Sequence, residues 1–346
     1  MVLFLFGCKD NKLEKELTKT LEYAKINGNT MGTTYNITYQ FLENINLKSE
    51  VDSILIEFNK SLSTYDSTST ISKFNLSKGD FCFDSKNDKY FLASLTRALE
   101  ISKETNGYFD PTVNPLVNYW GFGYKPRDKN LKPSKSDIDS LLKNVGYKKI
   151  GLLTKNDTCC IIRESPYVQL DLSASAKGHG VDVVASHLFQ LGIENYMVEI
   201  GGEIVVKGNN PEGKPWVIGI NKPTRGSALD EVQIPLMLKN QAMATSGNYR
   251  NYYDSGEISY AHIINPITGY SSPSDILSAT IVADDCLTAD AYATACMVLG
   301  LEKSIKLINS NPKLHAIFIY SNTEKTNFKY YYSAGLINAI DTSFNK

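Results

Sequence analysis

The second half of the chain carries many short β-like runs and too few helices to connect them as parallel strands. Parallel neighbours need a long crossover, usually a helix, between successive strands. The scarcity of helices therefore predicts an antiparallel-rich α+β fold with helices packed on the sheets. After Ile150, the expected strands are Thr158–Ile162, Val168–Leu172, Tyr196–Ile200, Trp216–Ile220, Val232–Leu238, Ser278–Val282 and Ala316–Tyr320, and the expected helices are Lys177–Leu191, Thr288–Leu299 and Glu302–Asn309.

The first half predicts a smaller set of elements. Asn36–Phe41 alternates like a strand, and apolar residues recur at helical spacing over Leu47–Leu62. A second helix is expected over Lys89–Thr105, where Asn106-Gly107 gives a left-handed stop signal. Gly121–Ser136 is expected to be a loop, followed by a helix over Ser136–Asn144.

Charge and cysteine content exclude several function classes. The chain has 36 basic and 37 acidic residues, so no net field would recruit nucleic acid. The six cysteines form no CxxC pair, and the four histidines are scattered, so no zinc site is expected. Cys159 and Cys160 are adjacent in a strand-like run and should point to opposite faces, which prevents a bond between them. Which other cysteines pair is left open.

The N-terminus, Met1–Asp10, is a short apolar run that ends in Gly7-Cys8 and is too short to span a bilayer. Leu5-Phe6-Gly7-Cys8 resembles the lipobox of a bacterial lipoprotein, although the usual basic region is missing. On this interpretation residues 1–19 are a signal remnant and tether. The protein would then be anchored through a lipid on Cys8 in the cell envelope, facing the periplasm. The alternative is an apolar tail with an incidental cysteine.

The expected helix over Thr288–Leu299 carries Asp290 and Thr294 four residues apart. On a helix this spacing places a carboxylate and a hydroxyl on one face. Small residues surround them, so the two oxygens can lie deep in the fold and still meet a hard cation, which prefers oxygen ligands. Spacing alone also fits a helix start or a satisfied core pair.

Several turn-rich motifs accompany this pair. Asp171–Gly180 is expected to open a helix with small residues and free amides, where an anion can lie and where Lys177 offers a positive charge. An exposed strand-to-helix turn explains it equally well. Gly201-Gly202 interrupts a strand before Glu203, which indicates either a bulge or close approach of a ligand.

These motifs, in their order along the chain, resemble those of the ApbE family, the FAD:protein FMN transferases. The resemblance runs from Met31 to about Gly300 and includes a match in each part of the chain. The matching stretches are Met31–Thr33, Ser63–Tyr65, Ser69–Asn75, Gly107–Leu116, Asp171–Gly178, Val198–Glu203, Thr245–Gly247, His262–Gly269 and Ala289–Thr294. It implies an ApbE-like, T-fold-like α+β domain over residues 20–346.

The resemblance also implies a reaction and its site. FMN would pass from FAD to a Thr or Ser hydroxyl of a target flavoprotein, forming a phosphoester and releasing AMP, with Mg²⁺ at the pyrophosphate. The implied magnesium ligands are Asp290, Thr294 and the carbonyl oxygen of Ala174. The implied FAD-contacting positions are Met31, Tyr65, Tyr108, Phe109, Asp110, Asp171, Lys177 and Ile264. The implied acceptors are flavoprotein subunits of membrane-bound, ion-pumping redox complexes.

His262 is the candidate base for the acceptor hydroxyl, because its ordinary pKa suits neutral pH. Asp284 and Asp285 are rival carboxylates. Two alternatives are hydrolysis of FAD to FMN and AMP at the same metal site, and FAD binding by a lipoprotein without chemistry. Two residues depart from the family pattern: His179 replaces a common aromatic residue after Lys-Gly, and Asn265 replaces a common Asp.

Overall fold

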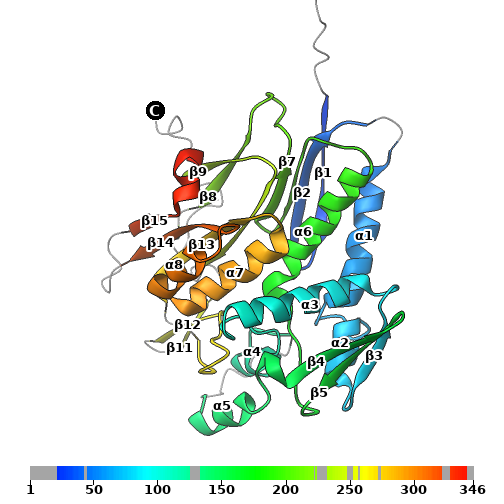
Figure 1. Cartoon of the computed structure of the whole chain (residues 1–346), viewed down its shortest axis with the longest axis vertical. Coiled ribbons are helices and arrows are strands. Elements are labelled where there is room, and N and C mark those ends of the chain that lie inside the picture. Colours follow the sequence, from blue (N-terminus) through cyan, green and yellow to red (C-terminus); the bar gives the residue numbers. More distant parts are fainter. Residues whose placement is uncertain are drawn as a thin grey trace, which may run out of the picture.

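An eight-stranded antiparallel sheet is the central element of the structure, a computed structural model (Figure 1). The structure describes residues 22–42, 45–124, 133–221, 223, 232–247, 252–255, 258–271, 274–321 and 328–340. The predicted tether, residues 1–19, and Cys8 lie outside this part of the chain. In spatial order, the strands of the sheet are β1 (Tyr23–Thr30), β2 (Thr33–Gln40), β6 (Tyr196–Ile200), β7 (Glu203–Lys207), β10 (Gln241–Gly247), β13 (Ile276–Ala283), β14 (His315–Ser321) and β15 (Phe328–Tyr332).

Both faces of this sheet are covered, because its strands bury side chains on alternate sides. On β10, Ala242 and Ala244 join the clusters under the helices, whereas Met243 between them joins a cluster on the opposite face. That opposite face packs against the hairpin of β8 (Trp216–Asn221) and β9 (Val232–Leu238). The alanines on the helix side allow helices to lie close to the strands.

Two helices, α6 (Ser173–Gln190) and α7 (Cys286–Leu299), lie on the sheet, and further helices cover them (Figure 1). Helix α1 (Leu47–Leu62) packs against α6, and α3 (Lys89–Glu104) packs against both α6 and α7. Helix α8 (Leu301–Asn309) follows α7 in the chain and packs against it. Helix α7 is buried on nearly all sides, as expected for a run of small and apolar residues at the centre of a fold.

Helices α6 and α7 approach each other closely at Gly178. A Cβ atom there would lie 2.3 Å from the carbonyl oxygen of Cys286 and 2.9 Å from the Cβ of Asp290. A side chain at this position would therefore push the helices apart. The contact is tied further by Asp182 of α6, whose carboxylate accepts hydrogen bonds from the amides of Cys286 and Leu287, each at 2.8 Å. These amides belong to the first turn of α7, whose N–H groups have no partner within the helix.

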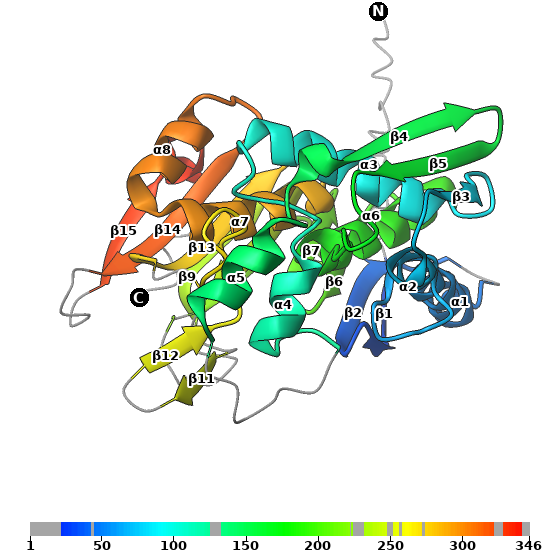
Figure 2. The ribbon, with the colours of Figure 1, turned by 90° about the horizontal axis from the view of Figure 1, so that it is seen from below.

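The remaining elements form a lower region and small hairpins, which Figure 2 shows from below. A three-stranded sheet has the order β3, β5, β4. The other elements are α2 (Thr70–Leu76), β3 (Phe81–Asp84), α4 (Asn114–Trp120), α5 (Lys135–Leu142), β4 (Ile150–Lys155), β5 (Thr158–Arg163), β11 (Tyr252–Ser255), β12 (Ile258–Ala261) and the short 3₁₀ helices η1 (Tyr147–Lys149) and η2 (Ala334–Ala339).

The predicted antiparallel-rich α+β class is confirmed, and one predicted strand is wrong. Residues 168–172 lie in an extended segment with a single bridge, between Val113 and Gln169, because Val168, Leu170 and Leu172 point into the core without a neighbouring strand to continue the ladder. Helix α6 begins at Ser173 and not at Lys177, and α7 begins at Cys286 and not at Thr288. The predicted stop after α3 is confirmed, since Asn106 and Gly107 both have positive φ.

A disulfide joins Cys82 of β3 to Cys160 of β5, which lie directly opposite each other in the antiparallel register. Cys159 is buried and free, so the prediction that it does not pair with Cys160 is confirmed. The pairing could not be inferred from sequence, because it requires the register of two strands separated by 78 residues. In the part of the chain that the structure describes, no helix has the length and apolar character needed to cross a membrane.

Candidate functional site

Three buried or half-buried charges meet where α6, α7 and the β6–β7 hairpin converge. The ammonium Nζ of Lys177, in the second turn of α6, lies 3.1 Å from Oε1 of Glu203 and 3.9 Å from Oδ2 of Asp290. Asp290 and Glu203 are each only 3% exposed, whereas the Lys177 side chain is 31% exposed. Two carboxylates and one ammonium therefore share a site that opens toward solvent on the lysine side.

The predicted metal ligands Asp290 and Ala174 meet at one backbone amide. The N–H of Gly178 donates to Oδ2 of Asp290 at 3.1 Å. In an α-helix the amide of residue i+4 faces the carbonyl of residue i, so the carbonyl of Ala174 faces this same amide. Asp290 therefore approaches α6 at the amide four residues after Ala174, whose carbonyl oxygen is the predicted main-chain ligand.

The third predicted ligand, Thr294, lies one turn beyond Asp290 on α7. Its hydroxyl is 3.2 Å from the hydroxyl of Ser246 on β10, and the neighbouring Thr245 hydroxyl is 2.9 Å from that of Thr280 on β13. The Thr294 and Ser246 hydroxyls lie on the helix side of the sheet, whereas Thr245 and Thr280 lie on its other face, because neighbouring residues of a strand point to opposite faces. Among the described residues no three His, Cys, Asp or Glu side chains form a metal cluster, so a cation here would depend on carbonyl and hydroxyl oxygens as well.

Electrostatics keep Lys177 charged. Burial alone would lower its pKa, but Asp290 and Glu203 outweigh this effect and hold the pKa of Lys177 above its usual value. Burial raises the pKa of both carboxyl groups, and the positive charge of Lys177 opposes that rise. A cation bound beside these groups would favour the ionised form of both carboxyl groups.

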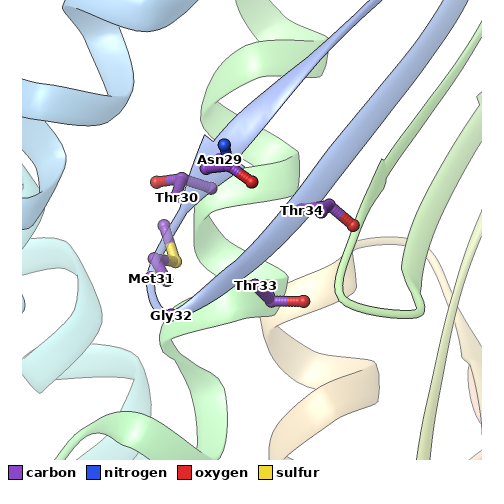
Figure 3. Close-up of a pocket in the computed structure, with 6 residues that line it drawn as sticks. All are labelled: Asn29, Thr30, Met31, Gly32, Thr33 and Thr34. Carbon is purple, nitrogen blue, oxygen red and sulfur yellow. The ribbon is translucent and has the colours of Figure 1, made fainter.

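Met31 lies at the turn between β1 and β2, beside helix α6 (Figure 3). Its φ of 50° is in the left-handed region, and a Cβ on Gly180 would lie 2.5 Å from the Met31 methyl carbon. A shallow cavity of about 430 Å³ is lined by residues 29–34 of this turn. The predicted FAD contact at Met31 is thus at a surface opening that adjoins α6.

Tyr108, Phe109 and Asp110 form a loop beside Asp171. The amide of Asp171 donates to the carbonyl of Pro111 at 2.7 Å, which ties the two segments together. The Tyr108 hydroxyl accepts a hydrogen bond from Lys303 of α8 at 2.8 Å. Phe109 is 3% exposed and packs in the main core, so its ring supports this loop from below.

Asp110 stabilises the conformation of the loop formed by residues 108–110 through hydrogen bonds. One oxygen accepts from the amide and hydroxyl of Thr112 at 2.8 and 2.6 Å, and the other accepts from the Tyr147 amide at 2.6 Å. Burial raises its pKa, while these donors act in the opposite direction. The structure therefore gives this predicted FAD-contacting residue a clear role in shaping the loop next to Asp171.

The remaining predicted residues lie on other segments of the chain. Tyr65 is 74% exposed in the loop between α1 and α2. Ile264 is buried in a separate apolar cluster with Leu116 and Trp120, and His262 lies edge-on to Phe122 with ring centroids 6.4 Å apart. The rival carboxylates have other contacts, since Asp285 caps α7 and Asp284 lies 3.8 Å from Lys313.

Sequence reasoning did not assign Glu203, Asp182 or Lys303 a place at the site. Gly201-Gly202 marks a tight turn, and a charged residue directly after such a turn was a usable signal for Glu203. Asp182 was harder to find, because its role depends on the packing of α6 against α7. Lys303 was likewise hidden, since its partner Tyr108 is 195 residues away.

Comparisons with solved structures place the chain in a class of flavin transferases by fold. It superposes on the flavin transferase ApbE from Vibrio cholerae with a TM-score of 0.79 and 37% identity, covering 91% of this chain and 98% of that one. The apo flavinyl transferase ApbE of Pseudomonas stutzeri gives a TM-score of 0.79 at 30% identity, over 91% of this chain and 95% of that one.

The sequence comparisons agree with the fold. The ApbE family model matches residues 31–318, and the chain belongs to the ApbE family. A protein of Haemophilus influenzae named FAD:protein FMN transferase is 38% identical over 85% of each chain. The protein of that name in Escherichia coli K12 is 32% identical, over 88% of this chain and 86% of its own.

His179, next to the site, is a buried neutral histidine. Its Nδ1 lies 2.5 Å from the Ser94 hydroxyl, and its ring packs edge-on against Phe58 at 5.2 Å. Burial lowers its pKa to about 4. An unfolded histidine has its ordinary pKa near 6.5, so protonation favours the unfolded chain between these values.

We therefore expect His179 to lower the free energy of unfolding as the pH falls from about 6.5 to about 4. Replacing it by Phe, an aromatic residue without a titrating group, should remove about 2 kcal/mol of the loss between pH 7 and pH 4.5. Urea denaturation of both proteins at the two pH values measures the effect. An equal pH dependence in His179→Phe and the parent protein would contradict the expected burial of a neutral ring.

Proposed function

We propose that this chain is a Mg²⁺-dependent FAD:protein FMN transferase that attaches FMN through a phosphoester bond to a Thr or Ser hydroxyl of a flavoprotein and releases AMP. The observation that carries the proposal is the meeting of Asp290, the Gly178 amide and Lys177 on two packed helices. The related proteins are named FAD:protein FMN transferases, which supports flavin transfer as the activity. The carboxylate of Asp290 and the ammonium of Lys177 are groups suited to binding a pyrophosphate together with its cation.

The residues present fit Mg²⁺. Asp290 offers a buried carboxylate, Ala174 a carbonyl and Thr294 a hydroxyl, and this all-oxygen set suits a hard cation. Asp290 is also a buried carboxyl group whose Oδ2 lies 3.9 Å from the Lys177 ammonium. When bound, Mg²⁺ would supply charge stabilisation at the pyrophosphate oxygens.

The chain's own residues position the reaction. Lys177 places a positive charge beside the site, where it stabilises negative charge that develops on the phosphoryl oxygens. The acceptor oxygen forms a bond to the FMN phosphorus as the bond from that phosphorus to the AMP oxygen breaks. AMP leaves with the bonding electron pair, and the hydroxyl proton passes to a base, for which we propose His262.

Replacement of Asp290 by Asn keeps the shape and an acceptor for the Gly178 amide but removes the charge. We expect FMN transfer to fall by about 100-fold or more, because a charged cation ligand is lost. Purified protein is incubated with FAD, Mg²⁺ and a candidate acceptor domain. The readouts are the intact mass of the acceptor and the chromatographic separation of FAD, FMN and AMP.

Glu302→Gln is the matched control, because Glu302 is an exposed carboxylate in a surface pair with Lys306. It should transfer flavin like the parent protein. Free FMN and AMP with an unmodified acceptor would favour the hydrolase. Intact FAD with the parent protein would overturn both enzymatic proposals and leave FAD binding alone. Full activity of Asp290→Asn would contradict the cation site.

Replacement of His262 by Ala should lower the rate of FMN transfer far more than the affinity for FAD. The physical reason is that a base acts on the hydroxyl proton in the chemical step and is not needed to bind the dinucleotide. The pH profile of transfer should also lose its acidic limb if His262 is the group that must be deprotonated. Near-normal turnover in this variant would remove His262 from the mechanism.

For the partners and location, we propose acceptor flavoprotein subunits of membrane redox complexes and a lipid anchor on Cys8 in the envelope, facing the periplasm. The Cys82–Cys160 disulfide supports this location, because disulfides persist in oxidising compartments such as the periplasm.

Metabolic labelling with palmitate in a bacterial host tests the anchor. We expect label in the parent protein, found in the membrane fraction, and none in Cys8→Ala, which should become soluble after cell disruption. Lipidation adds a large apolar free energy of membrane binding that the folded domain does not otherwise supply. Equal fractionation of both proteins without label would contradict the proposed anchor.

A further inference from the structure

Lys177 lies between two carboxylates, so its ammonium and a bound cation would compete for the carboxylate of Asp290. Its ammonium is 3.1 Å from Glu203 and 3.9 Å from Asp290, so it forms its closer ion pair with Glu203. Asp290 is the carboxylate that a cation would use. A lysine that moved onto Asp290 would neutralise that carboxylate and occupy the place of the cation.

The hairpin fixes Glu203 where it can hold Lys177. Gly201 and Gly202 have φ values of 63° and 102°, which side chains rarely tolerate, and they turn the chain so that Glu203 pairs with Ile200. A Cβ on Gly201 would lie 3.3 Å from Cδ of Lys177 and 2.9 Å from a methyl of Thr33. The lysine stem thus passes over a bare backbone on its way to Glu203.

Glu203 also has an unused oxygen. Its Oε2 is buried, and among the described residues no donor reaches it. Buried polar atoms without a partner are rare and costly. A ligand that brings a hydrogen-bond donor to this oxygen would satisfy it.

We propose that Glu203 is a positioning residue: it holds the Lys177 ammonium away from Asp290 and so keeps the Asp290 carboxylate available to a divalent cation. This inference rests on the proposed function, in which Asp290 is a cation ligand. Glu203 acts through Lys177 and does not itself bind the cation. Removal of Glu203 leaves Asp290 as the nearest carboxylate for the ammonium, and cation affinity falls.

A double-mutant cycle on Glu203 and Lys177 tests this coupling. The probe is Mn²⁺ in the presence of ADP, which carries the adenosine and pyrophosphate of FAD but no flavin to transfer. Bound Mn²⁺ is measured from the loss of the free-ion signal in electron paramagnetic resonance. We expect Glu203→Gln to raise the Mn²⁺ concentration at half-saturation about tenfold in the parent protein and by less than about twofold in the Lys177→Met background.

Glu199→Gln is the matched control, since it makes the same change in the same hairpin at a residue whose partners are the Gly202 amide and Asn36. It should leave Mn²⁺ binding unchanged. Circular dichroism and thermal melting verify that each variant is folded. Lys177→Gln, measured in parallel, replaces Lys177→Met if the methionine disrupts folding.

The outcomes separate the inference from the proposed function on which it rests. An equal loss of affinity from Glu203→Gln with and without Lys177 would mean that Glu203 acts directly through its charge, and would overturn the positioning role alone. Absence of Mn²⁺ binding by the parent protein with ADP would overturn the cation site and this inference with it. Loss of the Glu203 effect in the Lys177 variants would support both.

Discussion

The contact between α6 and α7 at Gly178 is the constraint on which the site depends. The absence of a side chain at this residue lets the helices approach until its amide reaches the Asp290 carboxylate at 3.1 Å. Asp182 stabilises the same contact, because its carboxylate accepts hydrogen bonds from two amides in the first turn of α7. The two helices that carry Lys177 and Asp290 are therefore joined by hydrogen bonds as well as by apolar packing, which fixes the functional atoms to rigid elements.

This packing buries ionisable side chains, and removing a charged group from water costs free energy. Asp290 and Glu203 are almost fully buried, and a buried carboxylate is tolerated only with a partner. Lys177 supplies one positive charge for two buried carboxyl groups, and burial raises the pKa of both. A cation that binds only the folded state would stabilise that state and would favour the ionised form of both carboxyl groups.

The fold was predicted best where periodicity is strong. The antiparallel class, the central helix with Asp290 and Thr294, and the stop after α3 all follow from local patterns. Residues 168–172 show the limit of such patterns. Their alternation of apolar and polar residues indicates that one side of the segment is buried, but it does not show that a neighbouring strand is present. Strand β10 was not predicted, since its alanines and polar residues resemble neither a strand nor a helix until α7 is packed upon it.

Some residues of the site could be predicted from the sequence, but the way in which they come together in space could not. Lys177 and Asp290 could be nominated from motifs, yet Glu203 acquires its role only because the β6–β7 hairpin ends beside α6. Residues 177, 203 and 290 are brought together by sheet topology, which no local pattern encodes. A ligand at Lys177 would touch α6, the hairpin and α7 at once. Its binding would therefore strengthen the association of elements that are distant in the chain and would stabilise the folded state.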